Sequence, residues 1–521
     1  MRTVILVLTV LGATSAHAAK RITSAVFPPH STEAAGVELG YGIADVAGAA
    51  LYQSGAYQHL HLKQILSVAR HRGWTSADLA EAKMRNAAAK LLGAPVGSYG
   101  RVSKTDTGWR LTANVFRSDR VVPVVVDLPA DAARAVEVGG LAVAKAIAGL
   151  DKIKLRKGEV HPRSSSGPAM RAYLSCYATL VRQPMGLRES HVVEATTLAA
   201  ARGRCEEAVR LDPSFVDAWA ALSLASSLSL QTERAGEALK RTRGLAAYVP
   251  FAVLSEYWLA TRFKSNEAGA TVLRDGVRTY PGAMIFLSYL GEHLNITRDF
   301  KEALAVWNRY LAATTRSPYA LSQKGYSMAR LGRLDEAIAV SREAVVQDPE
   351  SMVVELELAS RLVDAKRLDE AAALLEPMAK EPEAFGELLS RLGYVYLLQR
   401  KHGPAEKTLD RALRLATGPS EWRTRGRTRY NLAIVMARLD KLREAEDHLL
   451  AAAKEGFVIT SSLRADSDLE KLKSRTRVAH LFKDPELELD PMLLQVSPFL
   501  TDSGGIPRPE AARPTAPGFS F

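Results

Sequence analysis

Cysteine is almost absent from this sequence, with two residues in 521, and aromatic residues make up only 7% of it. Two cysteines cannot build a disulfide-rich scaffold. After the first 18 positions, no stretch reaches the roughly 18 uncharged apolar residues that a membrane helix needs. A glycine-rich phosphate loop and a His-Glu-x-x-His motif are also lacking. The sequence therefore gives no indication of a nucleotide site or of that type of zinc protease.

Acidic residues are scarce at the front of the chain. The formal net charge is +12, and residues 19–167 carry +8 of it, from 20 Lys and Arg against 12 Asp and Glu. This front would suit an acidic protein surface or lipid head groups, and a merely solvated basic face is an equal alternative. Nothing in the sequence points to a nucleic-acid partner. The length predicts three or four domains, or one domain with a repeat array.

The first 18 residues are typical of a secretory leader. Met1 and Arg2 give a positive start, residues 4–13 form an apolar run, and small residues at Ala16 and Ala18 suit a signal peptidase. We expect cleavage after Ala18 and a mature protein in the periplasm, with secretion as an alternative. The same segment could instead be the buried first strand of a cytosolic protein.

A period of 34 residues runs through the second part of the chain. Columns four and seven residues after each small residue keep the same phase, which is the spacing of one helix face. Another column of mostly small residues lies twelve positions earlier, so each unit holds two helices that cross closely. The main column is Ala201, Ala235, Gly269, Ala303, Ala337, Ala371 and Ala405, followed by Ala445 after 40 residues.

The unit from Leu321 to Pro349 resembles a tetratricopeptide repeat (TPR), and so does the stretch from Trp219 to Ala235. The resemblance covers residues 168–457 in about eight units and implies an all-α superhelical solenoid whose first helices line a concave groove for a protein partner. The alternative is that these aromatic side chains are simply core. The groove that the resemblance implies would be lined by Phe251, Leu254, Trp258, Tyr319, Tyr326, Leu356, Tyr394, Tyr430 and Ile434.

The same resemblance bears on the two cysteines. Cys176 would occupy the small position of its helix, and Cys205 would lie one turn from the crossing point on the partner helix. A disulfide is within reach of that arrangement, and an oxidising compartment would favour it. Two small buried residues that stay reduced are the alternative.

Residues 19–150 lack the repeat and are predicted to form a small α/β domain. Helix patterns at 36–52, 76–92 and 134–150 alternate with strand patterns, and Asp106 and Gly108 lie in the turn of a hairpin. This order, with the run from Gly97 to Val102, is similar to the amino-terminal α/β domain of TolB-like proteins. The resemblance implies docking within the bacterial envelope. The predicted strands are 21–28, 57–62, 95–103, 109–117 and 121–128.

Three further segments belong to neither the α/β domain nor the repeats. Residues 151–167 are predicted to be a linker. Residues 458–496 should supply capping helices, because the open end of a solenoid must cover its apolar face. Residues 497–521 are rich in proline and are predicted to be disordered.

Few residues suggest catalysis. His59 and His61 would lie on one face of a strand and could touch a metal, but no third ligand can be placed, so a partly exposed pair is the simpler interpretation. We expect no enzyme activity, cofactor or metal. The leading hypothesis is an exported scaffold that binds protein in an envelope assembly such as secretion, pilus, polysaccharide export or motility. The alternatives are an exported ligand- or sugar-binding accessory module, and a cytosolic regulator if the leader is retained.

Overall fold

The computed structural model describes residues 21–72, 74–155, 164–182, 195–243, 249–314, 317–382, 384–418, 421–455, 457–458, 467–482 and 506–507. The predicted leader at 1–18 lies outside the described residues. So do residues 156–163 of the predicted linker and nearly all of the predicted proline-rich tail.

The first domain is a five-stranded sheet with the order β2-β1-β3-β4-β5. β1 is parallel to β2 and β3, whereas β4 is antiparallel to both of its neighbours. Helices α1 and α5 pack on each other and on the sheet. The elements are β1 (Ile22–Val26), α1 (Ala34–Gln53), β2 (Tyr57–His59), α2 (Leu62–His71), α3 (Ser76–Ala80), α4 (Ala82–Leu91), β3 (Val96–Thr105), β4 (Gly108–Arg117), β5 (Arg120–Pro129) and α5 (Ala132–Leu150).

Two local predictions in this domain differ from the structure. The strand expected at 57–62 ends at His59, and helix α2 follows it. Leu62, Ile65 and Ala69 are buried, and their spacing is that of one helix face. The helix expected at 76–92 is instead two helices, because Glu81 between them has an extended backbone.

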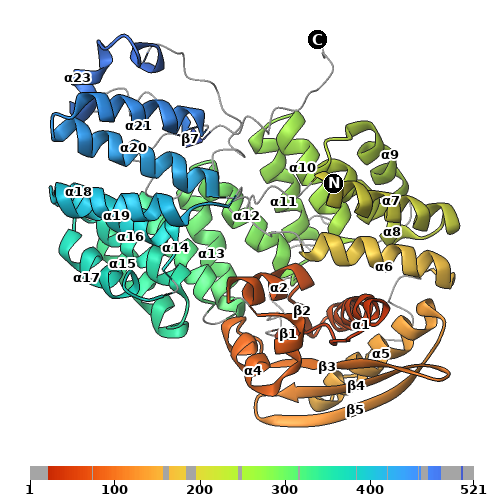
Figure 1. Cartoon of the computed structure of the whole chain (residues 1–521). Helices are drawn as coiled ribbons and strands as arrows, with labels where there is room; N and C mark the ends of the chain where they lie inside the picture. Colours follow the sequence, from red (N-terminus) through yellow and green to blue (C-terminus); the bar gives the residue numbers. More distant parts are fainter. Residues whose placement is uncertain are drawn as a thin grey trace, which may run out of the picture.

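Helices α6 to α21 form consecutive packed pairs, of which the earlier ones lie beside the first domain and the last ones, α20 and α21, lie away from it (Figure 1). This confirms the expected fold class, a small α/β domain followed by an all-α solenoid. The helices are α6 (Gly167–Arg182), α7 (Ala195–Leu211), α8 (Val216–Leu228), α9 (Thr232–Arg243), α10 (Pro250–Phe263), α11 (Asn266–Thr279), α12 (Met284–Ile296), α13 (Phe300–Thr314), α14 (Pro318–Arg330), α15 (Leu334–Gln347), α16 (Met352–Asp364), α17 (Leu368–Met378), α18 (Gly386–Leu398), α19 (His402–Leu415), α20 (Trp422–Arg438) and α21 (Leu442–Lys454).

Small residues allow the two helices of a pair to approach closely. A Cβ atom on Gly291 would lie 2.5 Å from the ring of Trp307, which is fully buried. A Cβ atom on Gly393 would lie 2.6 Å from Leu409. Cores tolerate little added volume. The column twelve positions before the main one therefore holds small residues where the partner helix carries a large side chain.

The end of the solenoid is covered by three short helical turns, η2 (Ser467–Leu469), α23 (Glu470–Lys473) and η3 (Ala479–Phe482). Leu469, Leu472 and Val478 are fully buried there, in a cluster with the last helices. Two short strands, β6 (Phe457–Val458) and β7 (Ile506–Pro507), pair beside α20. Among the described helices, none is long and apolar enough to cross a membrane.

The two domains share one core. A single cluster of buried side chains extends from Ala25 in β1 to Ala320 in α14. Helix α6 packs directly on α1, α2 and α5. The α/β domain is therefore part of the same folded body as the first repeats.

Candidate functional site

The nine candidate groove residues all lie on the first helices of their pairs, but most of them are buried. Six are buried, and the other three are partly exposed. Phe251 is covered by His61 of the α/β domain, with their ring centres 5.6 Å apart. The buried six are Phe251, Leu254, Tyr326, Leu356, Tyr430 and Ile434.

Trp258, Tyr319 and Tyr394 are the candidates that remain partly exposed. The Tyr319 hydroxyl donates to Glu292, and its ring lies edge-on to Trp307. The three residues belong to α10, α14 and α18, so they do not form one cluster. The repeat pattern assigned all nine residues to first helices, but it did not show which of these side chains are covered.

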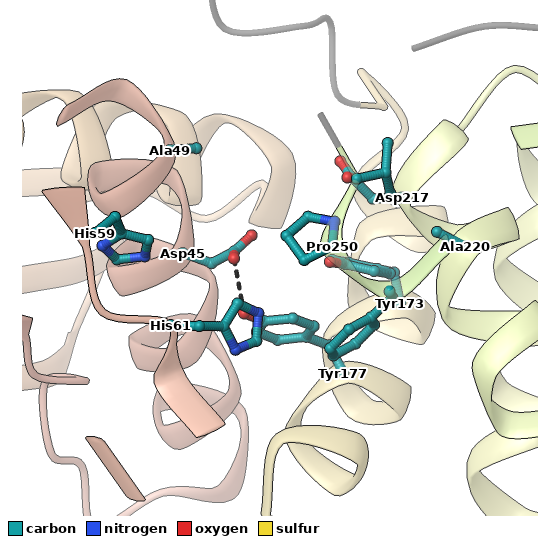
Figure 2. Close-up of a pocket in the computed structure, with 11 residues that line it drawn as sticks. Asp45, Ala49, His59, His61, Tyr173, Tyr177, Asp217, Ala220 and Pro250 are labelled. Atoms are coloured by element: carbon teal, nitrogen blue, oxygen red, sulfur yellow. Dashed lines mark hydrogen bonds between the residues drawn. The ribbon is translucent and has the colours of Figure 1, made fainter. Parts of the chain in front are cut away.

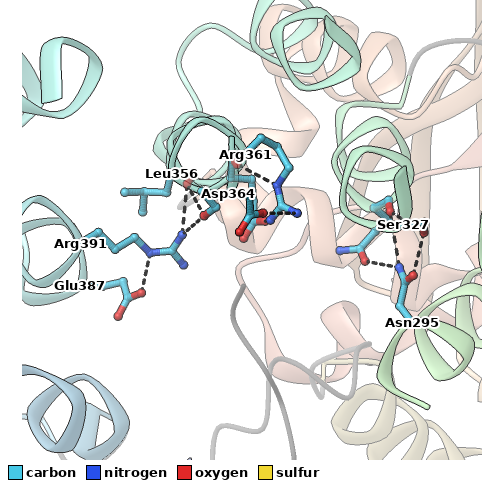
Figure 3. A network of polar contacts seen from close by, with 10 residues as sticks. Asn295, Ser327, Leu356, Arg361, Asp364, Glu387 and Arg391 are labelled. Atoms are coloured by element: carbon cyan, nitrogen blue, oxygen red, sulfur yellow. Dashed lines mark hydrogen bonds and ion pairs between the residues drawn. The ribbon is translucent and has the colours of Figure 1, made fainter. Parts of the chain in front are cut away.

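A ladder of polar contacts connects the first helices of successive pairs (Figure 3). The Asn295 amide donates to Gln323, and Ser327 donates to Asn295 at 2.7 Å. Farther along, Arg361 is 1% exposed, and its guanidinium lies 5.2 Å from the ring centre of Tyr326. These contacts fix the stacking of neighbouring pairs, because each buried polar group requires a partner.

Glu387 of α18 is the centre of the strongest charged cluster. Arg391 donates to its carboxylate at 2.7 Å, Thr424 donates at 2.8 Å, and Arg427 of α20 forms an ion pair with it. Burial alone would raise the pKa of Glu387, but the two arginines and the hydrogen bonds hold the pKa at about 2. The carboxylate is therefore charged throughout the physiological range. Arg391 also donates to the Leu356 carbonyl, which ties α18 to α16.

The α/β domain lies along the turns that connect successive repeats. We call this contact the seam; it comprises the β2–α2 segment, residues 57–72, against the turns before α10, α12, α14 and α16. Helices α6 to α15 then form the braced half of the solenoid, and α16 to α21 form the open half. The seam includes His59 N–H to the Gly282 carbonyl at 3.0 Å, Gln58 Nε2 to the Ala313 carbonyl at 2.9 Å, and Arg72 to Asp348 at 3.0 Å.

A small cavity of about 30 Å³ lies in the seam, between the α/β domain and the first repeats (Figure 2). His59, His61 and Asp45 line it from the domain, and Tyr177 and Phe251 line it from the solenoid. The Tyr177 hydroxyl donates to Asp45 at 2.7 Å. This volume holds one or two water molecules, so the cavity is too small for a substrate.

Both histidines of the cavity are buried, with 5% of His59 and 4% of His61 exposed, which corrects the expectation of a partly exposed pair. Burial lowers the pKa of His59 to about 4 and that of His61 to about 3, although Asp45 opposes both shifts. Within the described residues, no group of three His, Cys, Asp or Glu side chains is arranged to hold a metal ion. The burial could not be foreseen, because the covering residues lie about 190 positions away in sequence.

Cys176 of α6 and Cys205 of α7 form a disulfide in the structure, with their Cα atoms 5.5 Å apart. Both residues are fully buried. The bond crosses the first helix pair, which packs directly against the α/β domain. It therefore links α7 covalently to α6, the helix that packs on the α/β domain.

No protein-family model matches the chain, and no curated protein matches it. Solved structures that align with it include MamA from Desulfovibrio magneticus RS-1, at 17% identity over 36% of this chain and 94% of that one, with a TM-score of 0.27. A tetratricopeptide repeat protein from Parabacteroides merdae aligns at 15% identity over 51% and 99%, with a TM-score of 0.37. A human IFIT1 dimer with m7Gppp-AAAA aligns at 15% identity over 67% and 79%, with a TM-score of 0.40.

At TM-scores of 0.27 to 0.40 and identities of 15–17%, none of these likenesses establishes a family for the chain. The chain's own helix pairs, spaced 34 residues apart and crossing at small residues, have the fold of a tetratricopeptide solenoid.

Proposed function

We propose that the chain is an exported, non-catalytic scaffold that binds another polypeptide on the open half of its solenoid. The observation that carries this proposal is the position of the α/β domain. In the described contacts it covers the repeat turns as far as Asp348 and Glu350, and it occupies this edge of the braced half. The open half keeps partly exposed side chains on its first helices, including Glu355 and Tyr394, and solenoids use such extended surfaces for recognition.

The disulfide supports export. Disulfides persist in the periplasm and outside the cell, whereas cytosolic thiols are kept reduced. The bond between Cys176 and Cys205 is independent of the leader pattern at the N-terminus. We therefore propose that the mature protein acts in the periplasm, in an envelope-associated assembly, with the TolB-like docking role of the α/β domain as part of this proposal.

A site-specific photo-cross-linker tests which surface binds the partner. Placed at Tyr394 in intact cells, it should capture one dominant polypeptide. Placed at Val346, which is 72% exposed on a second helix, it should capture none. Equal capture from both positions, or capture from Val346 alone, would contradict binding on the first helices of the open half.

Export has its own test. The mature chain from cells should begin at Ala19, and its cysteines should resist thiol labelling until a reductant is added. Met1 on the mature chain together with two reactive thiols would contradict export and would favour the cytosolic alternative.

A further inference from the structure

The two cavity histidines hold the β2–α2 segment against the solenoid. The His59 N–H donates to the Gly282 carbonyl at 3.0 Å, and the His59 ring packs against Gly48 so closely that a Cβ there would lie 2.1 Å from it. His61 packs its ring on Phe251 of α10. The N–H of Lys63 donates to His61 Nδ1 at 3.2 Å, which requires that nitrogen to be unprotonated.

The groups that face these histidines would stabilise a protonated imidazole only weakly. Asp45 of α1 is the nearest carboxylate, and it already accepts the Tyr177 hydroxyl of α6. Lys63 of α2 is itself a cation, buried with its ammonium donating to the Leu180 carbonyl at 2.8 Å. Asp217 of α8 and Tyr173 of α6 line the far side of the cavity, and α10 contributes the uncharged Val249, Pro250 and Phe251.

A charged imidazole in this place would therefore be poorly solvated. The Nδ1 atom of His59 is buried and has no hydrogen-bond partner among the described residues, so a proton added there would remain unsatisfied. Opening the seam would let water reach both rings. The closed conformation of the seam favours neutral histidines, and the open conformation favours protonated ones.

From this arrangement we propose that the seam is an acid-sensitive clasp, in which protonation of His59 and His61 releases the β2–α2 segment from the repeat turns. The released form exposes the turns before α10, α12 and α14. The α/β domain is then a detachable brace of the solenoid.

The direction in which pH changes the closing equilibrium follows from the difference in histidine pKa between the closed and open states. The pKa values of both rings are lowered in the closed state, against about 6.5 in an open one. The open state gains protons first as the pH falls below about 6.5, and the closed state does not. The closing equilibrium constant falls by up to about tenfold per histidine for each pH unit, down to the pKa of the closed state.

Spin labels on the full-length oxidised protein test this directly. Labels carried by unnatural residues at Val125 of β5 and Arg278 of α11, both exposed, report the distance across the seam. The distance distribution should lengthen and broaden between pH 6.5 and 4.5. The double variant His59→Gln with His61→Gln should keep its pH 7 distribution throughout that window, and His480→Gln, at an exposed histidine, should behave like the wild type.

Two results would overturn the clasp: an unchanged wild-type distribution down to pH 4.5, or opening of the double variant at the same pH as the wild type. If the double variant fails to close at pH 7, NMR titration of the histidines in the wild type decides. Rings that titrate near 6.5 without any change of distance would also refute the proposal.

Discussion

The braced and open halves of the solenoid are built from the same repeat, but they are held together differently. In the braced half, one cluster of buried residues includes the α/β domain, and a disulfide crosses the first pair. In the open half, the buried residues divide into separate clusters. The braced half therefore depends on contacts between distant parts of the chain, whereas the open half depends on neighbouring repeats.

Buried polar contacts between first helices also differ. In the braced half they include neutral pairs, such as the Ser223 and Ser255 hydroxyls and the Tyr257 hydroxyl with His293. In the open half they include an arginine–carboxylate pair, Arg427 of α20 with Glu387 of α18. The two halves should therefore respond differently to reduction, to acid and to the loss of a single charge.

Removal of the disulfide should have the largest effect. Cys176→Ala with Cys205→Ala opens a closure over a sequence separation of 29 residues, which costs the braced half about 3–4 kcal/mol in the chain-entropy account. Segment-resolved hydrogen exchange should show faster exchange in α6 to α8 and unchanged exchange in α18 to α21. An equal loss in both halves would show that they unfold as one unit and would remove the distinction.

A fall in pH should have the second-largest effect, and it should destabilise the braced half before the open half. The lowered pKa values of His59 and His61 mean that their contribution is present above about 6.5 and is lost as the pH falls toward 4. At pH 5.5 the loss of stability from the two rings together reaches up to about 3 kcal/mol. Glu387, with its pKa lowered to about 2, contributes above about 4.5 and loses that contribution only below it. Exchange corrected for intrinsic rates should therefore increase in the braced half first; earlier loosening of the open half would contradict this.

Much of this architecture was visible in the sequence. The 34-residue columns predicted the solenoid, because helix pairs need small residues where they cross, as at Gly291 against Trp307. Helix α2 was missed, although Leu62, Ile65 and Ala69 have helical spacing, because the alternation through residues 57–62 also fits a strand. The local residue pattern therefore predicted the type of an element only where it fitted a single type.

The seam could not be foreseen in the same way. The resemblance implied that Phe251 would line a groove, but the residue that covers it, His61, comes from a different domain. Asp45 and Tyr177 meet across 132 positions, and no local spacing relates them. A periodic sequence predicts contacts between neighbouring repeats, whereas contacts between the repeats and a non-repeating domain depend on how the two surfaces fit.

Loss of one charge in the open half should have an intermediate effect. Glu387→Gln leaves Arg391 and Arg427, each 8% exposed in its side chain, around a neutral amide. We expect a loss of about 2–3 kcal/mol, below the full cost of breaking a buried pair because the Glu387 side chain is 25% exposed. Exchange should quicken in α18 and α20 only. Glu237→Gln, at an exposed ion pair of α9, should change stability by less than about 0.5 kcal/mol.

The smallest effect concerns the point where the two halves meet. Arg72 is the last described contact of the α/β domain along the solenoid; it pairs with Asp348 and Glu350 and packs on Trp74, 5.2 Å from the ring centre. Arg72→Ala should act on a single turn, because its partners Asp348 and Glu350 both lie there. Amides of the turn between α15 and α16 should exchange severalfold faster, while α20 is unaffected. Arg101→Ala removes an ion pair with Glu81 in which both side chains are 61% exposed, inside the α/β domain, and should leave that turn unchanged. If both variants act alike on the turn, Arg72 does not link the halves, and the braced half ends one repeat earlier.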